Sequence, residues 1–341
     1  MHRCLELAKE GCGNVAPNPL VGAVLVHEGR IIGEGAHLNY GGPHAEVNCI
    51  NSVKPDDKEL ISRSVLYVSL EPCAHHGKTP PCADRIIEEK IPQVIIGCSD
   101  PFKEVNGKGI EKLRNAGVKV ETGILENECK EVNKRFFIFY IQHRPYIVLK
   151  WAQTADGIMA HEDLSRLHIS NEFTNIVVHR WRSEEASVLV GTNTAFFDDP
   201  ALTTRLWKGK NSLRLVIDMG LRLPSSLKLF DGTVSTIVFN TLKHAEAGKP
   251  LYYQVTKDVS LVHQVVNALY HMKIQSVLVE GGAKLLQSFI DEGYWDEARV
   301  ITNTGLTITS GLQSPQLQNH ITVKEEQLFS DHIIYYKNSC L

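Results

Sequence analysis

The sequence lacks several features that would each have pointed to a particular class of protein. It has only eight cysteines in 341 residues, far fewer than a disulfide-stabilised scaffold contains. Lys and Arg total 36 against 39 for Asp and Glu, a formal net charge of −3, so there is no basic surplus for strong non-specific binding to nucleic acid. The second half has no Gly-x-Gly-x-x-Gly after its first expected strand, so the usual dinucleotide-binding fingerprint is missing there.

Long apolar segments are also missing. The longest candidates, such as residues 136–141, are short and flanked by charge, so we expect no transmembrane helix. The first residues include Glu6, Lys9 and Glu10 where a signal peptide would have an apolar core, and we therefore expect a cytoplasmic protein. Cysteines in that compartment act as thiols, metal ligands or nucleophiles rather than forming disulfides.

The length predicts about two domains, each large enough to bury its own core. Pro145 disfavours helix at the residue before it, and we place the boundary there, which gives domains 1–144 and 145–341. Hydrophobic periodicity in the first domain predicts helices over 1–12, 44–50, 83–90, 109–116 and 127–142, and strands over 21–26, 30–33, 65–70, 94–97 and 118–120. In the second it predicts strands over 146–152, 187–190, 213–218, 236–240, 276–279 and 332–337, and helices over 171–186, 260–272 and 284–292. This alternation predicts α/β domains, the first with a largely parallel sheet.

One motif in the first half carries chemistry on its own. His44 and Glu46 begin an expected helix, and Cys73 follows a buried strand directly after Pro72, with Cys82 further along. One imidazole and two thiolates suit zinc, and three protein ligands leave the fourth tetrahedral position open for water, as in catalytic sites. Glu46 can then remove and relay a proton of zinc-activated water without binding the metal. His-x-Glu with Pro-Cys and a later Cys is typical of zinc nucleobase deaminases.

Two other interpretations of His44, Cys73 and Cys82 remain, a structural zinc site or unrelated core residues. A structural zinc site would need a fourth protein ligand, which His75 or His76 offers, but that reading gives no role to Glu46 or to Pro72. The remaining six cysteines are interpreted as inert thiols.

These motifs resemble the bifunctional deaminase/reductases of riboflavin biosynthesis, and the resemblance spans essentially the whole chain. The long insert between Cys73 and Cys82 is peculiar to that branch of the deaminases. The segments that carry the resemblance are 17–22, 44–46 and 71–82 in the first half and 150–157, 190–194, 198–203 and 279–282 in the second. It implies a cytidine-deaminase-like three-layer domain followed by a dihydrofolate-reductase-like α/β domain.

The resemblance also implies two successive reactions on one small phosphorylated pyrimidine. The first domain would remove the C2 amino group of a diamino-ribosylaminopyrimidinone 5′-phosphate, with one Zn²⁺ on His44, Cys73 and Cys82 and Glu46 as proton shuttle. The second domain would reduce the ribosyl group to a ribityl chain with NADPH. For the deaminase substrate it implies contacts from Asn18, His76, Lys78 and Asp100.

In the second half the resemblance assigns roles that the residues alone would not. Glu280-Gly281-Gly282 ends an expected strand and opens a helix, an arrangement that lets backbone N–H groups approach a phosphate. NADPH contacts are implied for Ala152, His168, Thr194, Asp198 and Gly282, and substrate contacts for Lys150, Leu202, Arg205 and Glu280. His168 stands where many relatives have tryptophan.

Four questions stay open on the sequence alone. The second half could have lost its reductase activity, which would leave a deaminase only. The alternative from another class, an RNA-editing module, is disfavoured by the net charge and by the lack of a basic-aromatic stripe. The preference for NADPH over NADH comes from the resemblance, as no arginine for a 2′-phosphate is identifiable, and a homo-oligomer, dimer or tetramer, is expected without a defined interface.

Overall fold

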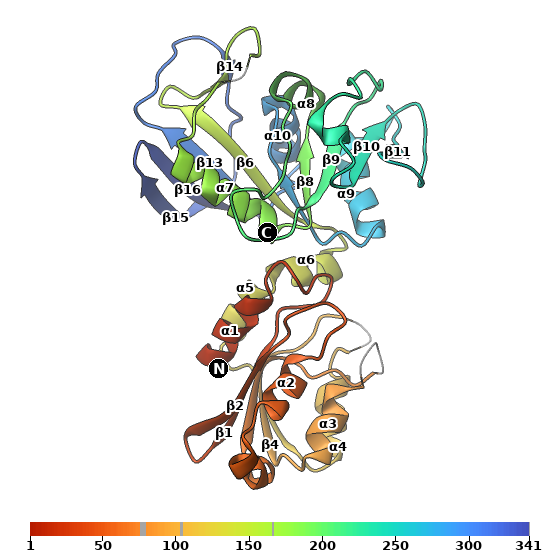
Figure 1. Ribbon diagram of the computed structural model, residues 1–341, viewed down its shortest axis with the longest axis vertical. Coiled ribbons are helices and arrows are strands. Elements are labelled where there is room, and N and C mark those ends of the chain that lie inside the picture. The colour runs from red at the N-terminus through yellow and green to blue at the C-terminus, as the bar shows by residue number, and fades with distance from the viewer. Residues whose placement is uncertain (76–79, 103–104, 166, 341) are drawn as a thin grey trace. The chain divides into compact units, whose positions relative to one another are not determined.

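The computed structural model describes residues 1–75, 80–102, 105–165 and 167–340. The chain divides into two compact units, Met1–His143 and Arg144–Leu341 (Figure 1). Each unit has its own sheet and its own hydrophobic core, so each can be understood by itself.

The first unit is a five-stranded sheet covered by helices on both faces, in the strand order β2-β1-β3-β4-β5. In Figure 1, α1 and α5 lie on one side of this sheet and α2, α3 and α4 on the other, which confirms the expected three-layer fold. The elements are α1 (His2–Ala8), η1 (Lys9–Gly11), β1 (Gly22–His27), β2 (Arg30–Ala36), α2 (Ala45–Asn51), η2 (Pro55–Arg63), β3 (Val65–Leu70), α3 (Cys82–Glu88), β4 (Gln93–Cys98), α4 (Lys108–Asn115), β5 (Lys119–Thr122), α5 (Glu126–Val132) and α6 (Lys134–Gln142).

The expectation of a largely parallel sheet is only half right. β3, β4 and β5 pair in parallel, whereas β1 is antiparallel to both of its neighbours, β2 and β3. The turn at Glu28 and Gly29, both with positive φ, joins β1 and β2 as a hairpin. Side chains alternate along β1, so that Ala23 and Leu25 pack beneath α2 and α3 while Val24 packs beneath α1.

The single helix predicted over 127–142 is wrong, because the structure has two helices that break at Asn133. The Asn133 side chain is buried and bonds both backbone polar groups of Leu20: its Oδ1 accepts from Leu20 N at 2.7 Å and its Nδ2 donates to Leu20 O at 2.8 Å. Asparagine competes readily with helical hydrogen bonding. The break therefore fastens α5 and α6 to the 16–20 segment, which lines the site described below.

The second unit is built on a nine-stranded sheet in the order β11-β10-β9-β8-β12-β6-β13-β16-β15. The seven strands from β11 to β13 run in parallel, and β16 and β15 complete the sheet in antiparallel pairing. The elements are β6 (Tyr146–Thr154), β7 (Ile158–Ala160), α7 (Glu172–Glu184), β8 (Ser187–Val190), α8 (Thr192–Asp198), β9 (Leu213–Ile217), η3 (Lys228–Phe230), β10 (Thr236–Asn240), β11 (Leu251–Gln254), α9 (Leu261–His271), β12 (Ser276–Val279), α10 (Ala283–Asp291), β13 (Glu297–Asn303), β14 (Leu312–Gln313), β15 (His320–Leu328) and β16 (Asp331–Asn338).

Two long strands of this unit were not predicted, for different reasons. In β13, which lies inside the sheet, two buried positions are occupied by the charged residues Glu297 and Arg299, which bond one another at 2.7 Å. The sequence of this strand therefore lacks the apolar pattern of a buried strand. β15 is a sheet edge with mostly exposed side chains, so it has almost no apolar alternation to detect.

The hydrophobic core of the second unit holds the strands whose ends form its site. Helices α9 and α10 bury Val265, Leu269 and Phe289 against the parallel strands, together with Trp151 of β6 and Leu189 of β8. The carboxyl ends of β6, β8 and β12 meet at one edge of the sheet, where open parallel sheets usually bind ligands.

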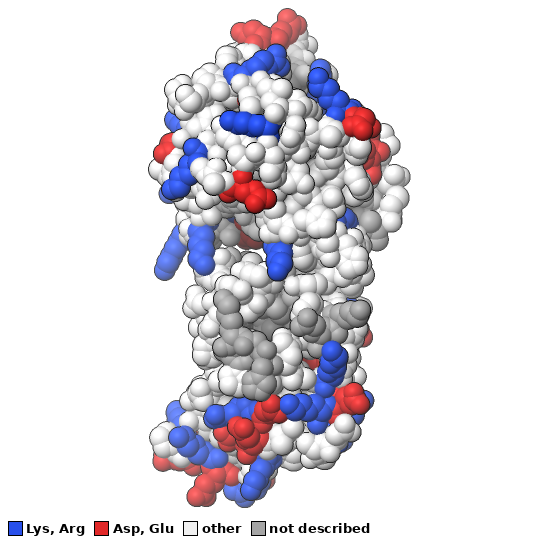
Figure 2. All heavy atoms as spheres, turned by 90° about the vertical axis from the view of Figure 1, so that its right-hand side faces the viewer, with Lys and Arg blue, Asp and Glu red and all other residues white. Residues whose placement is uncertain are grey.

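The surface agrees with the balanced composition. On the face shown in Figure 2, basic and acidic side chains are mixed over both units. Among the described residues, no helix has both the length and the apolar character that a membrane span requires.

Candidate active sites

Three soft donor atoms converge in the first unit. His44 is the N-cap of α2, Cys73 follows β3, and Cys82 is the first residue of α3. His44 Nδ1 lies 3.5 Å from Cys73 Sγ and 3.3 Å from Cys82 Sγ, and the three ligand atoms lie within 4.8 Å of one another. The sequence-predicted ligand set is therefore assembled around one point, with spacing that suits a single metal ion.

The electrostatics of this cluster favour a cation. A hydrogen bond from Cys82 lowers the pKa of Cys73 to about 4, and the same bond raises that of Cys82 well above its usual range. The backbone N–H of Cys82 also donates to Cys73 Sγ at 3.3 Å. The hydrogen bond with Cys73 raises the pKa of His44. The lowered pKa of Cys73 favours its thiolate form, which is the form of cysteine that binds a metal ion.

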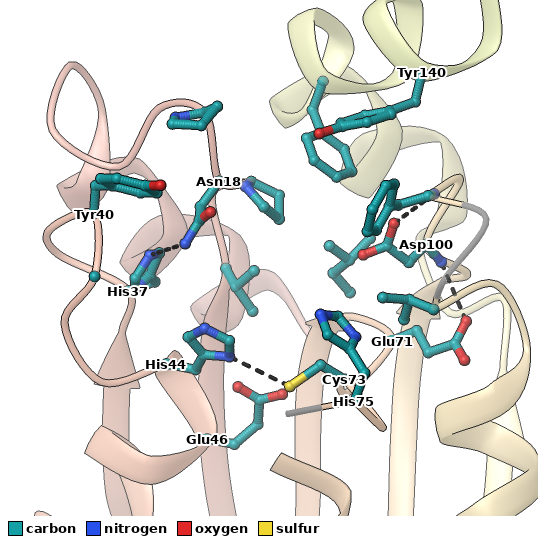
Figure 3. A pocket seen from close by; sticks show the side chains of 18 of the residues that line it. Asn18, His37, Tyr40, His44, Glu46, Glu71, Cys73, His75, Asp100 and Tyr140 are labelled. Carbon is teal, nitrogen blue, oxygen red and sulfur yellow. Dashed lines mark hydrogen bonds between the residues drawn. The ribbon is translucent and has the colours of Figure 1, made fainter. Parts of the chain in front are cut away.

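Glu46 lies beside the cluster in the first turn of α2 and is 3% exposed. Burial, helped by the charge on Cys73, raises the pKa of Glu46 to about 7. A carboxyl group that titrates near neutrality both accepts and returns a proton at the pH of the cell. Figure 3 shows Glu46 next to Cys73 and beneath His44, at the bottom of a cavity.

That cavity has a volume of about 240 Å³. On one side Asn18 lies in the turn before β1, and its Nδ2 is 3.1 Å from Nε2 of the buried His37 (Figure 3). His37 Nδ1 in turn lies 3.0 Å from the Pro43 carbonyl oxygen, and burial lowers the pKa of His37. The rings of Tyr40 and Tyr140 lie at opposite sides of the cavity in Figure 3.

The opposite wall is fixed by a carboxylate that sequence reasoning left without a role. Both oxygens of the buried Glu71 accept backbone N–H groups at 3.0–3.3 Å, from Asp100, Gly107, Gly109 and Ile110. A Cβ on Gly109 would lie 1.9 Å from Pro72 O, so only glycine lets α4 approach the Pro72-Cys73 turn this closely. Glu71 therefore holds the Cys73 turn and the Asp100 loop together.

Asp100 lines the cavity, as expected. It is 7% exposed, its Oδ1 accepts from Phe102 N at 2.8 Å, and burial raises its pKa to about 7. Phe102 continues this wall as an aromatic contact to Tyr140, with ring centroids 5.0 Å apart. His76 and Lys78, the other two predicted substrate residues, lie outside the described residues.

Several cavity residues were not predicted. Phe136 and Tyr140 reach the cavity from α6, the helix that the break at Asn133 reorients. His37 gives no sequence signal, because it lies after β2 in an otherwise ordinary loop. Glu71 had one: a charged residue directly after a buried strand and directly before Pro72-Cys73.

The second unit has two neighbouring cavities that share part of their lining. One, of about 620 Å³, lies against the N-terminus of α10 and includes Gly282. The other, of about 290 Å³, lies at the ends of β6 and β12. Both are lined by Met159, Leu167, Thr194 and Asp198. The smaller one also contains the remaining predicted residues of this half: Lys150, Ala152, His168, Leu202, Arg205 and Glu280.

A buried ion network anchors the smaller cavity. Both oxygens of Glu280 accept from Arg182 of α7, at 2.5 Å from Nε and 2.7 Å from Nη2, and Lys150 Nζ lies 3.8 Å away. Burial alone would raise the pKa of Glu280, but the Arg182 charge holds it below its usual value, while burial lowers the pKa of Lys150. Glu280 was expected to face a substrate, and here its first partner is Arg182, which sequence reasoning missed.

His179 is a second missed residue on the same face of α7. It is 3% exposed and its Nδ1 accepts from Leu206 N at 3.4 Å, which ties α7 to the segment carrying Arg205. Burial and the nearby Arg182 charge lower the pKa of His179 to about 4. His179 and Arg182 lie three residues apart, on the helix face that buries Val178 and Trp181. Two polar residues on an apolar helix face could have identified them as functional candidates from the sequence.

Comparison with known proteins gives matches over both units. Residues 1–98 match the model of the cytidine and deoxycytidylate deaminase zinc-binding region, and residues 145–307 match that of the RibD C-terminal domain. The riboflavin biosynthesis protein RibD of Aquifex aeolicus (strain VF5) is 38% identical, with 99% of this chain and 97% of that protein covered. RibD of Bacillus amyloliquefaciens is 39% identical over 87% of this chain and 81% of its own.

A solved structure resembles the whole chain. The crystal structure of a diaminohydroxyphosphoribosylaminopyrimidine deaminase/5-amino-6-(5-phosphoribosylamino)uracil reductase from Thermotoga maritima superposes with a TM-score of 0.90 at 36% identity. It covers 99% of this chain and 97% of that one. The similarity therefore includes both units.

Proposed function

The chain belongs to the RibD family of riboflavin biosynthesis proteins and has both a deaminase and a reductase domain, and on this basis we propose the two reactions that it catalyses. In residues 1–144, 2,5-diamino-6-ribosylamino-4(3H)-pyrimidinone 5′-phosphate loses its C2 amino group by hydrolysis. In residues 145–341, the ribosyl group of the product is reduced with NADPH to give 5-amino-6-ribitylaminouracil 5′-phosphate. The observation that carries the proposal is a buried carboxyl group beside a His-Cys-Cys cluster, in one chain with a separate pair of cavities.

Zinc suits the first site because of the chemistry of its donors. One imidazole nitrogen and two sulfurs within 4.8 Å of one another, with charge already developed on Cys73, match the ligands that zinc prefers. We propose one Zn²⁺ per chain, held by His44, Cys73 and Cys82. Zinc bound there supplies Lewis-acid activation of water for hydrolysis.

Glu46 moves the protons of this reaction. Its carboxylate takes a proton as water adds to C2 of the ring, and the resulting carboxylic acid returns that proton to the leaving amino group, which departs as ammonia. A pKa near 7 suits both halves of this exchange. Asn18 and Asp100 are proposed to bind the pyrimidine edge, and His76 and Lys78 the phosphate.

NADPH suits the larger cavity of the second unit. Its volume accommodates an extended ligand, and Gly282, with φ of 71°, opens α10 toward it with no side chain in the way. We propose that Thr194, Asp198 and Gly282 hold the cofactor, with Ala152 and His168 near its nicotinamide. NADPH supplies the hydride, and the shared wall at Thr194 and Asp198 would set nicotinamide and sugar side by side.

The substrate of the second reaction is proposed to occupy the smaller cavity. Glu280 and Lys150 would position the opened sugar, Leu202 would pack against it, and Arg205 would bind the phosphate through its planar guanidinium. The buried Arg182 keeps Glu280 ionised there, so that its carboxylate can accept hydrogen bonds from sugar hydroxyl groups.

We propose that the enzyme works in the cytoplasm as a homo-oligomer. The two proposed ligands, Cys73 and Cys82, form no disulfide, which fits a reducing compartment. The sheet edge β15 leaves Ile321 and Val323 more than half exposed, and such an apolar edge is a natural surface for a second copy. Light scattering of the wild type and of Val323→Lys tests the oligomer, because a monomeric wild type would contradict it.

One experiment tests both reactions. Purified chain is given the diaminopyrimidine substrate and NADPH, and ammonia release, NADPH consumption and zinc content are measured on the same sample. We expect one zinc per chain and equal molar amounts of ammonia formed and NADPH oxidised at completion. Ammonia without NADPH oxidation would leave a deaminase only, and active protein without zinc would contradict the proposed hydrolytic site.

A further inference from the structure

The side-chain amide of Asn18 has two chemically different ends, and only one of them can face a ligand in the cavity. Its Nδ2 is held 3.1 Å from His37 Nε2, and among the described residues no other side chain bonds this amide. We infer that His37 is a positioning residue: it fixes the rotation of the Asn18 amide, and through it the cavity selects a pyrimidine edge that carries an N–H donor. The inference rests on the proposed deaminase function for the identity of the substrate.

The direction of each hydrogen bond follows from the Pro43 carbonyl. A carbonyl oxygen only accepts, so the 3.0 Å contact requires His37 Nδ1 to carry the hydrogen. In a neutral imidazole the other nitrogen, Nε2, then has a lone pair and accepts. The partner that donates to it is the NH₂ group of Asn18. The alternative amide rotation would set Asn18 Oδ1 against that lone pair, acceptor against acceptor, and is disfavoured.

The consequence is a defined recognition group. With Nδ2 turned to His37, Asn18 Oδ1 points away from His37, as Figure 3 shows, and Asn18 lines the cavity. A carbonyl-type oxygen in this position accepts from a ring N–H or an amino group and repels a ring nitrogen with a bare lone pair. A 4(3H)-pyrimidinone presents N3–H on the edge next to C2, whereas cytosine has an unprotonated N3. The His37–Asn18 pair therefore favours the pyrimidinone class.

His37 is itself held firmly enough for this role. Its side chain is 1% exposed, and its backbone N–H donates to Val21 O at 2.9 Å. A Cβ on Gly11 would lie 2.3 Å from His37 O, so the backbone there is tightly enclosed. The ring packs edge-on against His44, with centroids 5.2 Å apart, so an effect through the metal cluster is the alternative that an experiment has to separate.

Two substitutions at His37 separate its two side-chain hydrogen bonds, one to Pro43 and one to Asn18. In His37→Asn the amide nitrogen replaces Nδ1 and keeps the bond to Pro43, but the acceptor for Asn18 is gone. In His37→Gln the amide oxygen lies near the position of Nε2 and restores that acceptor. With the diaminopyrimidine substrate, we expect His37→Asn to raise the KM of ammonia release about tenfold with little change in kcat, and His37→Gln to return KM close to wild type.

Asn18→Ala completes the experiment as a double-mutant cycle. If His37 acts through Asn18, His37→Asn adds no further rise in KM to Asn18→Ala, and zinc content is unchanged in every variant. Additive effects, loss of zinc in His37→Asn, or a His37→Asn enzyme with wild-type KM would each overturn the inference. NADPH oxidation by the same samples, with the deaminated substrate, corrects for the amount of folded protein. Wild-type chain that releases no ammonia would contradict the proposed function instead.

Discussion

In the first unit the proposed chemistry depends on side chains that hold a metal ion and transfer protons, while in the second unit it depends on a bound nicotinamide cofactor. His44, Glu46, Cys73 and Cys82 come from three elements and converge on one point, so their residue types alone indicate the reaction. The second unit offers two cavities and a buried ion pair, which we propose to orient ligands without reacting. A site made of reactive side chains can be recognised in a sequence by its residue types. A site that binds a reactive cofactor depends mostly on the shape of a cavity, which the sequence does not show directly.

The two units also bury charge in opposite ways. Among the described residues neither Glu46 nor Asp100 forms an ion pair with a lysine or arginine, and burial raises the pKa of both to about 7. In the second unit Glu280 is buried together with Arg182 and stays ionised. The first arrangement suits proton transfer, and the second suits fixed electrostatic positioning.

The largest expected effect is the loss of the first unit's activity alone. Glu46→Gln keeps the shape of the side chain but cannot carry a proton, so ammonia release should fall by about 10² to 10⁴-fold or more. NADPH oxidation with the deaminated substrate should stay within error of wild type, because Glu46 lies in a different unit. Both rates are measured on one preparation, with zinc content as the check that the ligand cluster is intact. Loss of both activities in a folded, zinc-loaded variant would contradict two independent sites.

The matching change in the second unit should have the reverse pattern. Glu280→Gln leaves Arg182 and Lys150 buried without their counter-charge, a loss that typically costs about 3–5 kcal/mol. We expect NADPH oxidation to be lost while ammonia release is retained. All four tryptophans lie in this unit, so urea unfolding followed by tryptophan fluorescence reports its stability selectively.

A second ion pair provides the control for that experiment. Asp231→Asn removes the negative charge that lies 2.8 Å from the buried Arg214, and neither residue lines either cavity. This variant should lose stability by tryptophan fluorescence but keep its NADPH oxidation rate per folded molecule. If Glu280→Gln also keeps that rate, Glu280 serves only to hold the fold together.

The sequence was sufficient for the elements with clear periodicity and for the side chains of the His-Cys-Cys cluster. Strands such as β3 and β12 are short apolar runs, and His44, Cys73 and Cys82 stand out by residue type. The break at Asn133 could not be predicted, because it depends on a bond to Leu20, more than a hundred residues away.

Other failures share that physical cause. β13 was hidden by Glu297 and Arg299, whose charges are compensated inside the sheet by each other and by Glu184 and Glu185. The roles of His37, Glu71 and Arg182 are set by partners distant in sequence: Asn18, the start of α4 and Glu280. The local sequence pattern indicates which secondary structure a residue favours, whereas the partners of its side chain are known only from the fold.

The smallest effect concerns pH and again separates the units. His179 is buried and its pKa in the folded chain is about 4, against an ordinary value near 6.5. As pH falls below 6.5 the unfolded chain takes up a proton at this residue and the folded chain does not, so stability is lost between pH 6.5 and 4 and is unaffected above that window. Between pH 7 and pH 5 the loss should be about 2 kcal/mol for the second unit.

His179→Asn does not titrate and its side-chain oxygen can still accept from Leu206 N, so tryptophan-detected urea unfolding should show a smaller loss over the same interval. Asp100 in the first unit has the opposite sign, because its raised pKa costs stability as pH rises from about 3.8 to 7, and a probe that averaged both units would hide the difference. An equal loss in wild type and His179→Asn would assign the acid sensitivity of the second unit to other groups.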